Sequence, residues 1–263
     1  MNTSARLTML TRLGFAVRGA LYLVIAFLIL RTGRAEDPAG ALRYLGESGG
    51  QLLLGIMAAG LIGYGIWRLS DAAFNIERHD DDKHGVLERV GAAASGFIHL
   101  FLAWQAIKLM QGAASSGGDS TQEGAQTAMS LPGGGVLVIL GGLVLVGVGI
   151  LQMAKAVRAK FLEHLDPAVA RQAWAQWSGR IGYAARGLVF MISGYFLLSA
   201  GFQERSEQAG GMEKALGWLS NPWDIVIAIG LLGFGIFGLI EARNRRLHDA
   251  PVDGMVRRAV NGV

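Results

Sequence analysis

Charged residues occur at matching positions within the apolar stretches of this chain, where an unpaired charge is costly to bury. Arg18 and Arg186 each lie six residues after another arginine, close to the start of an apolar stretch. Asp71 and Glu241 each lie near the end of a later stretch. Because a buried charge without a partner strongly destabilises a protein, an arginine and a carboxylate should occur together. We therefore predict the pairs Arg18–Asp71 and Arg186–Glu241, with separate contacts to lipid headgroups as the alternative.

The middle of the chain departs from this pattern at both positions. Ser95 replaces the arginine, and Lys155 replaces the carboxylate. A joint change is expected if the two positions form an ion pair, since either charge alone would be stranded. His99 aligns with aromatic residues in the other copies, so we expect a hydrogen-bonded packing residue, with a proton relay or ligand as the alternative. The candidate site is a polar cluster on the cytoplasmic side, comprising Arg18, Asp71, His99, Gln105, Lys155, Arg186 and Glu241.

Other kinds of chemistry have little support in the sequence. Cysteine is absent, which excludes disulfides, thiolate metal sites and a cysteine nucleophile. No Ser/His/Asp set or His-Glu-x-x-His motif is present, and the glycine-rich segments lack the Lys-Ser/Thr ending of a phosphate loop. The loop 78–84 mixes histidines with carboxylates, but its spacing matches no defined metal site. We expect no enzymatic activity, no cofactor and no metal.

The elements that must position the candidate residues are membrane helices. Apolar residues make up 52% of the 263 residues, and the 39 glycines suit the close packing of helices in a membrane. Stretches long enough to span a bilayer occur at about 13–31, 50–68, 90–110, 135–155, 181–200 and 223–241. We predict an all-α membrane protein with six transmembrane helices.

Two recurring patterns group these helices in pairs. The segments 12–19, 89–96 and 180–187 align without gaps at the starts of the odd-numbered helices, and a Gly-x-Gly motif recurs in each even-numbered helix. Three tandem two-helix repeats within one membrane domain, at about 11–75, 88–160 and 179–246, explain this spacing. All three repeats then enter the membrane in the same direction, and we predict a bundle around a pseudo-threefold axis. Duplication that merely enlarged the bundle is the alternative.

Basic residues are distributed unevenly between the two sides that six spans define. The termini and the loops on their side carry 18 lysines and arginines, whereas the opposite side carries six. The positive-inside rule therefore predicts that both termini are cytoplasmic. This bias also accounts for the pI of 9.6, so we expect no nucleic-acid partner. The N-terminal segment is expected to be a mature helix, not a signal peptide, because it recurs later in the chain.

Shorter helices are expected beside the spans. Related segments at 41–45, 128–131 and 215–219 precede the even-numbered spans, and Pro132 and Pro222 follow two of them. We interpret these segments as amphipathic helices at the outer interface. The charged segment 157–177, which Pro167 interrupts, is expected to form helices along the cytoplasmic membrane surface.

The repeated opening Arg-x-Gly-(Tyr/Phe)-x-(Ala/Val)-Arg-Gly, followed by Gly-x-Gly helices, resembles a bacterial membrane family called domain of unknown function 1206. The resemblance extends from about Arg12 to Asp249. The second repeat departs from it, with Ala92 at the aromatic position and Ser95 in place of arginine. The resemblance implies three two-helix repeats in one chain and a location in the bacterial inner membrane. It implies no activity.

Function follows only in outline from these features. The spans contain no deep carboxylate and no broken helix at the midplane. We therefore expect a structural or interaction component of the cell envelope, which contacts the lipid bilayer and either a membrane-protein partner or a second copy. The alternative is a small-solute or ion transporter or channel that favours anions and uses the pseudo-threefold axis. Convergence of the polar residues on one water-accessible cavity would favour transport.

Overall fold

The computed structural model describes residues 3–33, 35–77, 83–112, 119–219 and 221–246, and helices make up most of this part of the chain. Six helices are long and apolar enough to cross a membrane. They are α1 (Thr3–Thr32), α2 (Pro38–Phe74), α3 (Lys83–Met110), α5 (Gly134–Arg158), α7 (Ala173–Gln203) and α9 (Trp223–Asn244). Shorter elements lie between them: α4 (Ser120–Met129), η1 (Lys160–His164), α6 (Pro167–Ala170), η2 (Ser206–Gln208) and α8 (Met212–Trp218). The chain is a multi-pass membrane protein.

All six predicted spans are confirmed as helices, and each lies within one of the six long elements. The main difference concerns α7, which begins at Ala173 and includes Trp174 and Trp177, two residues that the sequence assigns to a surface helix. The rest of that segment contains the end of α5, then η1 and α6. Asp166 caps α6, because its side chain accepts a hydrogen bond from a backbone amide of the helix, and Pro167 occupies the first turn.

A short helix precedes each even-numbered span, although the predicted segment 128–131 is helical only at 128–129. These helices are the 38–49 part of α2, then α4, and then α8. The first is joined to its span through Gly50, whose φ of 68° and ψ of −169° are accessible in practice only to glycine. The second begins at Asp119, which caps α4 and also accepts a hydrogen bond of 2.7 Å from the backbone amide of Gly211. Asp119 therefore ties the second repeat to the third.

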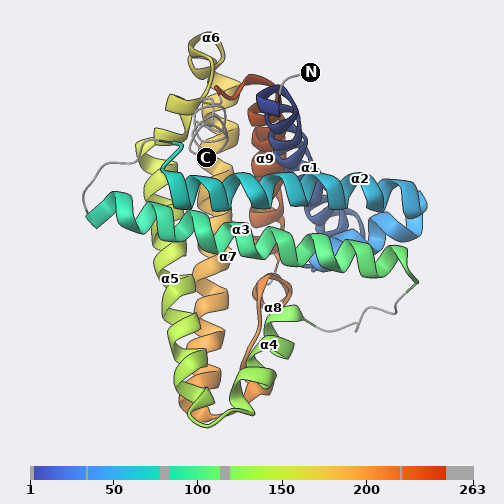
Figure 1. Cartoon of the computed structure of the whole chain (residues 1–263). Helices are drawn as coiled ribbons and strands as arrows, with labels where there is room; N and C mark the ends of the chain where they lie inside the picture. Colours follow the sequence, from blue (N-terminus) through green and yellow to red (C-terminus); the bar gives the residue numbers. More distant parts are fainter. Residues whose placement is uncertain (1–2, 34, 78–82, 113–118, 220, 247–263) are drawn as a thin grey trace, which may run out of the picture.

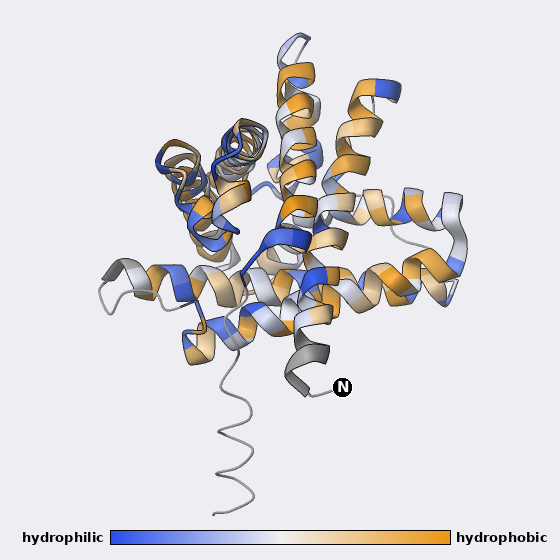
Figure 2. Ribbon diagram, turned by 90° about the horizontal axis from the view of Figure 1, so that it is seen from above, coloured by the Kyte–Doolittle hydropathy of each residue, from blue (hydrophilic) through white to orange (hydrophobic). Residues whose placement is uncertain are grey.

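The six long helices pack in the order α3, α2, α1, α9, α7, α5. Figure 1 shows the pair α2 and α3 running across the pair α5 and α7, with α1 and α9 beside them. Hydrophobic residues extend along most of the long helices, as Figure 2 shows. The two helices of the second repeat, α3 and α5, stand at opposite ends of this order and share at most marginal contact among the described residues. Only 22% of the apolar span of α5 is buried within the protein, against 61% for α1 and α9.

Helices of successive repeats meet through pairs of glycines. At each contact, a methyl group added to either glycine would lie within 2.7–3.1 Å of the carbonyl oxygen of the other. A side chain at these positions would force the backbones apart, so the glycines permit the close approach. The pairs at equivalent positions of the three interfaces, which we call the shared glycines, are Gly19–Gly235, Gly65–Gly96 and Gly149–Gly187; the contact of α5 with α7 also contains the pair Gly142–Gly194.

The first arginine of each repeat donates hydrogen bonds across the same three interfaces. Arg12 donates a hydrogen bond of 3.1 Å to the carbonyl of Ala242, at the end of α9. Arg89 donates one of 2.9 Å to Ala72 at the end of α2, and Arg180 donates one of 3.0 Å to Val157 at the end of α5. A cation that binds the last free carbonyls of a helix also interacts favourably with the helix dipole.

The first glycine of each Gly-x-Gly motif has a different partner from the second. In the first repeat, a methyl group on Gly63 would lie 2.7 Å from the carbonyl oxygen of Leu10, on the other helix of the same repeat. Gly14 likewise approaches α2 closely. Their counterparts in the second repeat, Gly147 and Gly91, have no atom of another part of the protein within 4 Å of an added methyl group. The second repeat therefore keeps the glycines of an interface that it does not form.

Candidate functional site

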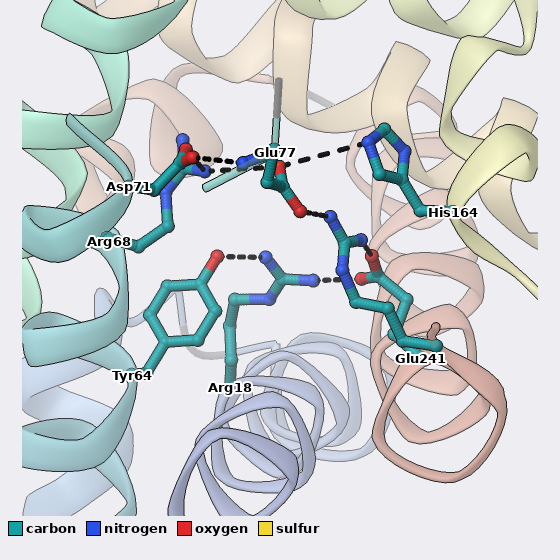
Figure 3. A network of polar contacts seen from close by, with 8 residues as sticks. Arg18, Tyr64, Arg68, Asp71, Glu77, His164 and Glu241 are labelled. Atoms are coloured by element: carbon teal, nitrogen blue, oxygen red, sulfur yellow. Dashed lines mark hydrogen bonds and ion pairs between the residues drawn. The ribbon is translucent and has the colours of Figure 1, made fainter. Parts of the chain in front are cut away.

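The centre of the site is an arginine buried between the first and third repeats. Arg18 on α1 is 6% exposed, and its Nη1 donates a hydrogen bond of 2.6 Å to the hydroxyl of Tyr64 on α2. Its Nη2 forms an ion pair with Glu241 on α9 (Figure 3). The guanidinium also lies 5.1–5.2 Å from the centres of three aromatic rings, those of Phe15, Tyr64 and Phe234. Arg18 thus has both a carboxylate and a set of cation–π contacts.

Glu241 extends the network to a second arginine. Arg245 lies four residues further along the chain, and its guanidinium bridges Glu241 and Glu77. Burial alone would raise the pKa of Glu77, but the charges of Arg245, His164 and Arg68 lower it to about 2. His164 lies 3.9 Å from Glu77, and burial followed by the charge of Arg245 lowers the pKa of this histidine.

Asp71 joins the network at the end of α2. Its carboxylate lies 3.3 Å from Nη1 of Arg68 and accepts a hydrogen bond of 2.8 Å from the backbone amide of Glu77. Arg68 also lies 3.7 Å from the carboxylate of Glu77. Asp71 therefore fixes the turn that brings Glu77 back toward Arg245. The network connects all three carboxylates, Asp71, Glu77 and Glu241, with three arginines.

The predicted partners of the arginines are wrong. Arg18 pairs with Glu241 of the third repeat, whereas Asp71 pairs with Arg68 of its own helix. The reason is that α1 packs closely on α9 through the shared glycines, which brings Glu241 within reach of Arg18. Arg186 makes no ion pair with any described residue. Its guanidinium lies over three aromatic rings, at 5.5 Å from Tyr22, 4.8 Å from Phe190 and 4.9 Å from Phe234.

The other predicted site residues, His99, Lys155 and Gln105, take no part in the ion pairs of this network. His99 is buried, its Nδ1 lies 2.7 Å from the carbonyl oxygen of Ser95, and its ring is 4.5 Å from that of Tyr64. This geometry favours the packing role over a proton relay. Lys155 and Gln105 are half-buried, and neither forms a hydrogen bond or ion pair with a described residue. The loop 78–84, considered above for metal binding, lies outside the described residues and side chains.

Several members of the network were not predicted from the sequence. Arg68 and Arg245 could have been found, because they lie three residues before Asp71 and four residues after Glu241, spacings at which helical side chains meet. Tyr64 belongs to the Gly-x-Gly motif but gave no sign of a polar role. Glu77 follows the end of α2 and His164 is the last residue of η1, and only the fold places them near the arginines.

The arrangement is chemically suited to holding helices together. Each carboxylate of the network is neutralised by at least one arginine, and the contacts link α1, α2 and α9 with the segment that contains His164. Arg186 and Lys155 remain as cations with no carboxylate partner among the described residues.

Comparison with known proteins adds the following. The family model described as Domain of Unknown Function (DUF1206) matches residues 13–75, 90–159 and 181–245. The chain is 29% identical over 243 residues to an uncharacterized protein, YxxB, of Bacillus subtilis (strain 168), a match that covers 88% of each chain. No solved structure matches the chain.

Proposed function

The chain belongs to the DUF1206 family, and we propose that it is an interaction component of the bacterial inner (plasma) membrane. In this proposal the open second repeat binds a transmembrane helix, supplied by another membrane protein or by a second copy of the chain. We assign the protein no catalytic activity. Both termini are placed in the cytoplasm, since basic residues are concentrated on their side.

One observation carries this proposal: a methyl group added to Gly91 or Gly147 would have no atom of another described part of the protein within 4 Å. At the equivalent positions of the first repeat, Gly14 and Gly63 allow α1 and α2 to approach each other closely. A glycine in a membrane helix weakens the helix, and its benefit is the close packing of another backbone. Two such positions on the exposed faces of α3 and α5 therefore support an interface with a further helix.

The remaining contacts support a pseudo-threefold arrangement. The shared glycines join the first repeat to the second, the second to the third and the third to the first. The first arginine of each repeat follows the same cycle. A closed ring of six helices would need one further contact, between α3 and α5. This gap is where we place the partner helix.

Cysteine crosslinking tests the proposal directly, because the native chain has no cysteine. Gly91→Cys and Gly147→Cys would each be expressed in cells, and isolated membranes would be treated with a short crosslinker that carries one thiol-reactive group and one photoreactive group. We expect each variant to give a discrete adduct, identified by mass spectrometry. The matched control is Ile236→Cys, a lipid-facing position that is 42% exposed on α9 and should give none.

A bulky side chain separates a specific contact from random collision. Gly147→Leu, combined with Gly91→Cys, should abolish the adduct without destabilising the monomer, because an added side chain meets no other part of the protein there. Equal adduct yields from Gly91→Cys and Ile236→Cys would contradict the proposal. So would a crosslink between positions 91 and 147 of one chain carrying both cysteines, since the repeat would then close on itself.

Transport of anions is a second candidate, which the cationic residues favour. Arg186 and Lys155 form no ion pair with a carboxylate in the described part of the chain, and Arg18, Arg68 and Arg245 belong to one polar network (Figure 3). Purified protein in liposomes loaded with a chloride- or phosphate-sensitive dye would test this activity. Anion flux in wild-type liposomes that Arg186→Gln reduces would support transport, and flux equal to that of empty liposomes would exclude it for the anions tested.

A further inference from the structure

The two helices of the first repeat and the two helices of the third repeat pack through the same set of contacts. In the first repeat, a methyl group added to Gly60 on α2 would lie 2.5 Å from Cγ2 of Val17 on α1. In the third repeat, a methyl group added to Gly230 on α9 would lie 2.3 Å from Cβ of Ala185 on α7. Each glycine lies five residues before the shared glycine of its own helix, and each partner lies two residues before the shared glycine of the other helix.

A second contact of this set is also present in both repeats. A methyl group added to Gly14 on α1 would lie 2.9 Å from Cα of Tyr64 on α2. In the third repeat, a methyl group added to Gly182 on α7 would lie 2.5 Å from Cα of Phe234 on α9. All four residues are buried, so this packing face is closed in both repeats.

The second repeat carries a complementary pair of residues at these positions but leaves them exposed. At the position of Gly60, α5 carries Val144, which is 60% exposed. At the position of Val17, α3 carries Ala94, which is also exposed. The small residue and the valine have exchanged helices between the first and second repeats, so a small residue would still face a valine. The exposed faces of α3 and α5 therefore remain complementary to each other in volume.

Charges at one end of the two faces are complementary as well. Glu88 lies one turn before Gly91 on α3, and it shares the side of the helix that carries this glycine. Lys155 lies about two turns after Gly147 on α5, again on a shared side. The charge of Glu88 acts on Lys155 within the chain, yet Lys155 forms no ion pair with a described residue. A surface like that of α3, seated on α5, would bring a carboxylate to this lysine.

We propose that two copies of the chain pack together, with α3 of each copy seated on α5 of the other through the contacts that the first and third repeats form internally. Within one chain, α3 and α5 stand at opposite ends of the order in which the helices pack. A second copy presents both faces, so each exposed face meets its complement and the contact, made twice, closes the dimer. The inference rests on the proposed function, because it names the helix that the open second repeat binds.

Disulfide formation between differently tagged chains tests this pairing, because the native chain has no cysteine. Ala94→Cys with one tag and Val144→Cys with another would be expressed in the same cells, and isolated membranes would be oxidised with copper phenanthroline. We expect a reducible species that carries both tags. Either variant alone should give at least about tenfold less crosslinked dimer, because a disulfide forms only between Cβ atoms about 3.5–4.5 Å apart.

Leu143→Cys is the matched control for Val144→Cys. It lies at nearly the same depth on α5 and is also exposed, but its counterparts Ala59 and Ile229 stay exposed in the repeats that form the contact. Combined with Ala94→Cys, it should give little of the species with both tags. Thermal unfolding checks that each variant folds, and Leu87→Cys with Gly147→Cys is a second pair, equivalent to the contact of Leu10 with Gly63.

The outcomes distinguish this inference from the proposed function. A species with both tags that the Leu143→Cys control lacks supports the dimer. If neither cysteine pair gives such a species, the dimer is overturned; the proposed function survives if Gly91→Cys still captures another protein with the photoreactive crosslinker, and fails if it captures none. A disulfide within a single chain that carries both Ala94→Cys and Val144→Cys overturns both, since the second repeat would then close on itself.

Discussion

Replacement of Glu241 by glutamine tests the network at the residue that most of it shares. Glu241 is 1% exposed and forms ion pairs with both Arg18 and Arg245. Glutamine keeps the length of the side chain and one acceptor oxygen but removes the charge. Arg245 then retains Glu77, whereas Arg18 retains only the hydroxyl of Tyr64 and its aromatic contacts. The loss of stability should therefore come mainly from Arg18, which is left without a carboxylate partner.

The magnitude follows from the contacts that remain. Removing one partner of a buried ion pair costs about 3–5 kcal/mol, and because Arg245 keeps a carboxylate we expect about 3 kcal/mol for Glu241→Gln. In a double-mutant cycle, Arg18→Gln and Glu241→Gln should be coupled by about 1–3 kcal/mol. Arg18→Gln and Asp71→Asn should instead add within about 0.5 kcal/mol, because Asp71 pairs with Arg68.

Unfolding in mixed micelles of dodecyl maltoside and sodium dodecyl sulfate, followed by tryptophan fluorescence, would give the free energies of unfolding. The pair Arg43–Glu36 is a matched control, since its groups are 3.4 Å apart and partly exposed. Its coupling should stay below about 1 kcal/mol. If Arg18 were coupled to Asp71 as strongly as to Glu241, or to neither, the proposed basis of the network would be refuted.

Three further predictions concern stability and can be checked by thermal unfolding in detergent. The pKa of Glu77 falls from its ordinary 4.5 to about 2 on folding, and that of His164 falls below its ordinary 6.5, so the unfolded chain binds more protons at low pH. These two groups should leave stability unaffected above about pH 7, lower it below about pH 6.5 and lower it further between about pH 4.5 and 2, a last decline that Glu77→Gln should remove. Gly19→Ala should destabilise the protein by about 2 kcal/mol or more, because the methyl group would lie 2.7 Å from a backbone oxygen of α9. Gly147→Ala should change stability by less than about 1 kcal/mol. Equal effects of the two variants would contradict the packing of these helices. Asp119→Ala should cost about 1–3 kcal/mol, since it removes the cap of α4 and the acceptor of an amide in the third repeat, and Asp119→Asn should recover part of this loss.

The spans and the short helices before them could be predicted because their causes are local. Hydropathy over about 20 residues decides whether a segment can cross a bilayer. Proline then ends the preceding helices, as at Pro132 and Pro222, which lie between a short helix and a span in the structure. The exception is the start of α7, where Trp174 and Trp177 continue the helix beyond the apolar stretch.

The ion-pair partners could not be predicted because they depend on which repeats touch. The sequence shows that Arg18 and a late carboxylate are related, but Asp71 and Glu241 occupy the same position in their repeats. Only the packing of α1 on α9 selects Glu241. In the structure, the second glycine of each Gly-x-Gly motif contacts a helix of a different repeat. The sequence motif alone does not show which of its two glycines makes that contact, so it could not identify the partner of Arg18.

The pairing of Arg18 with Glu241 has a consequence for synthesis of the protein. The two residues are 223 positions apart, so the first helix enters the membrane long before its carboxylate partner has been translated. Until α9 arrives, Arg18 must remain hydrated, held by lipid headgroups or shielded by the insertion machinery. A chain that stops before α9 would leave this charge exposed in the bilayer. The last helix therefore has to be inserted before the first helix gains the contact that neutralises its buried charge.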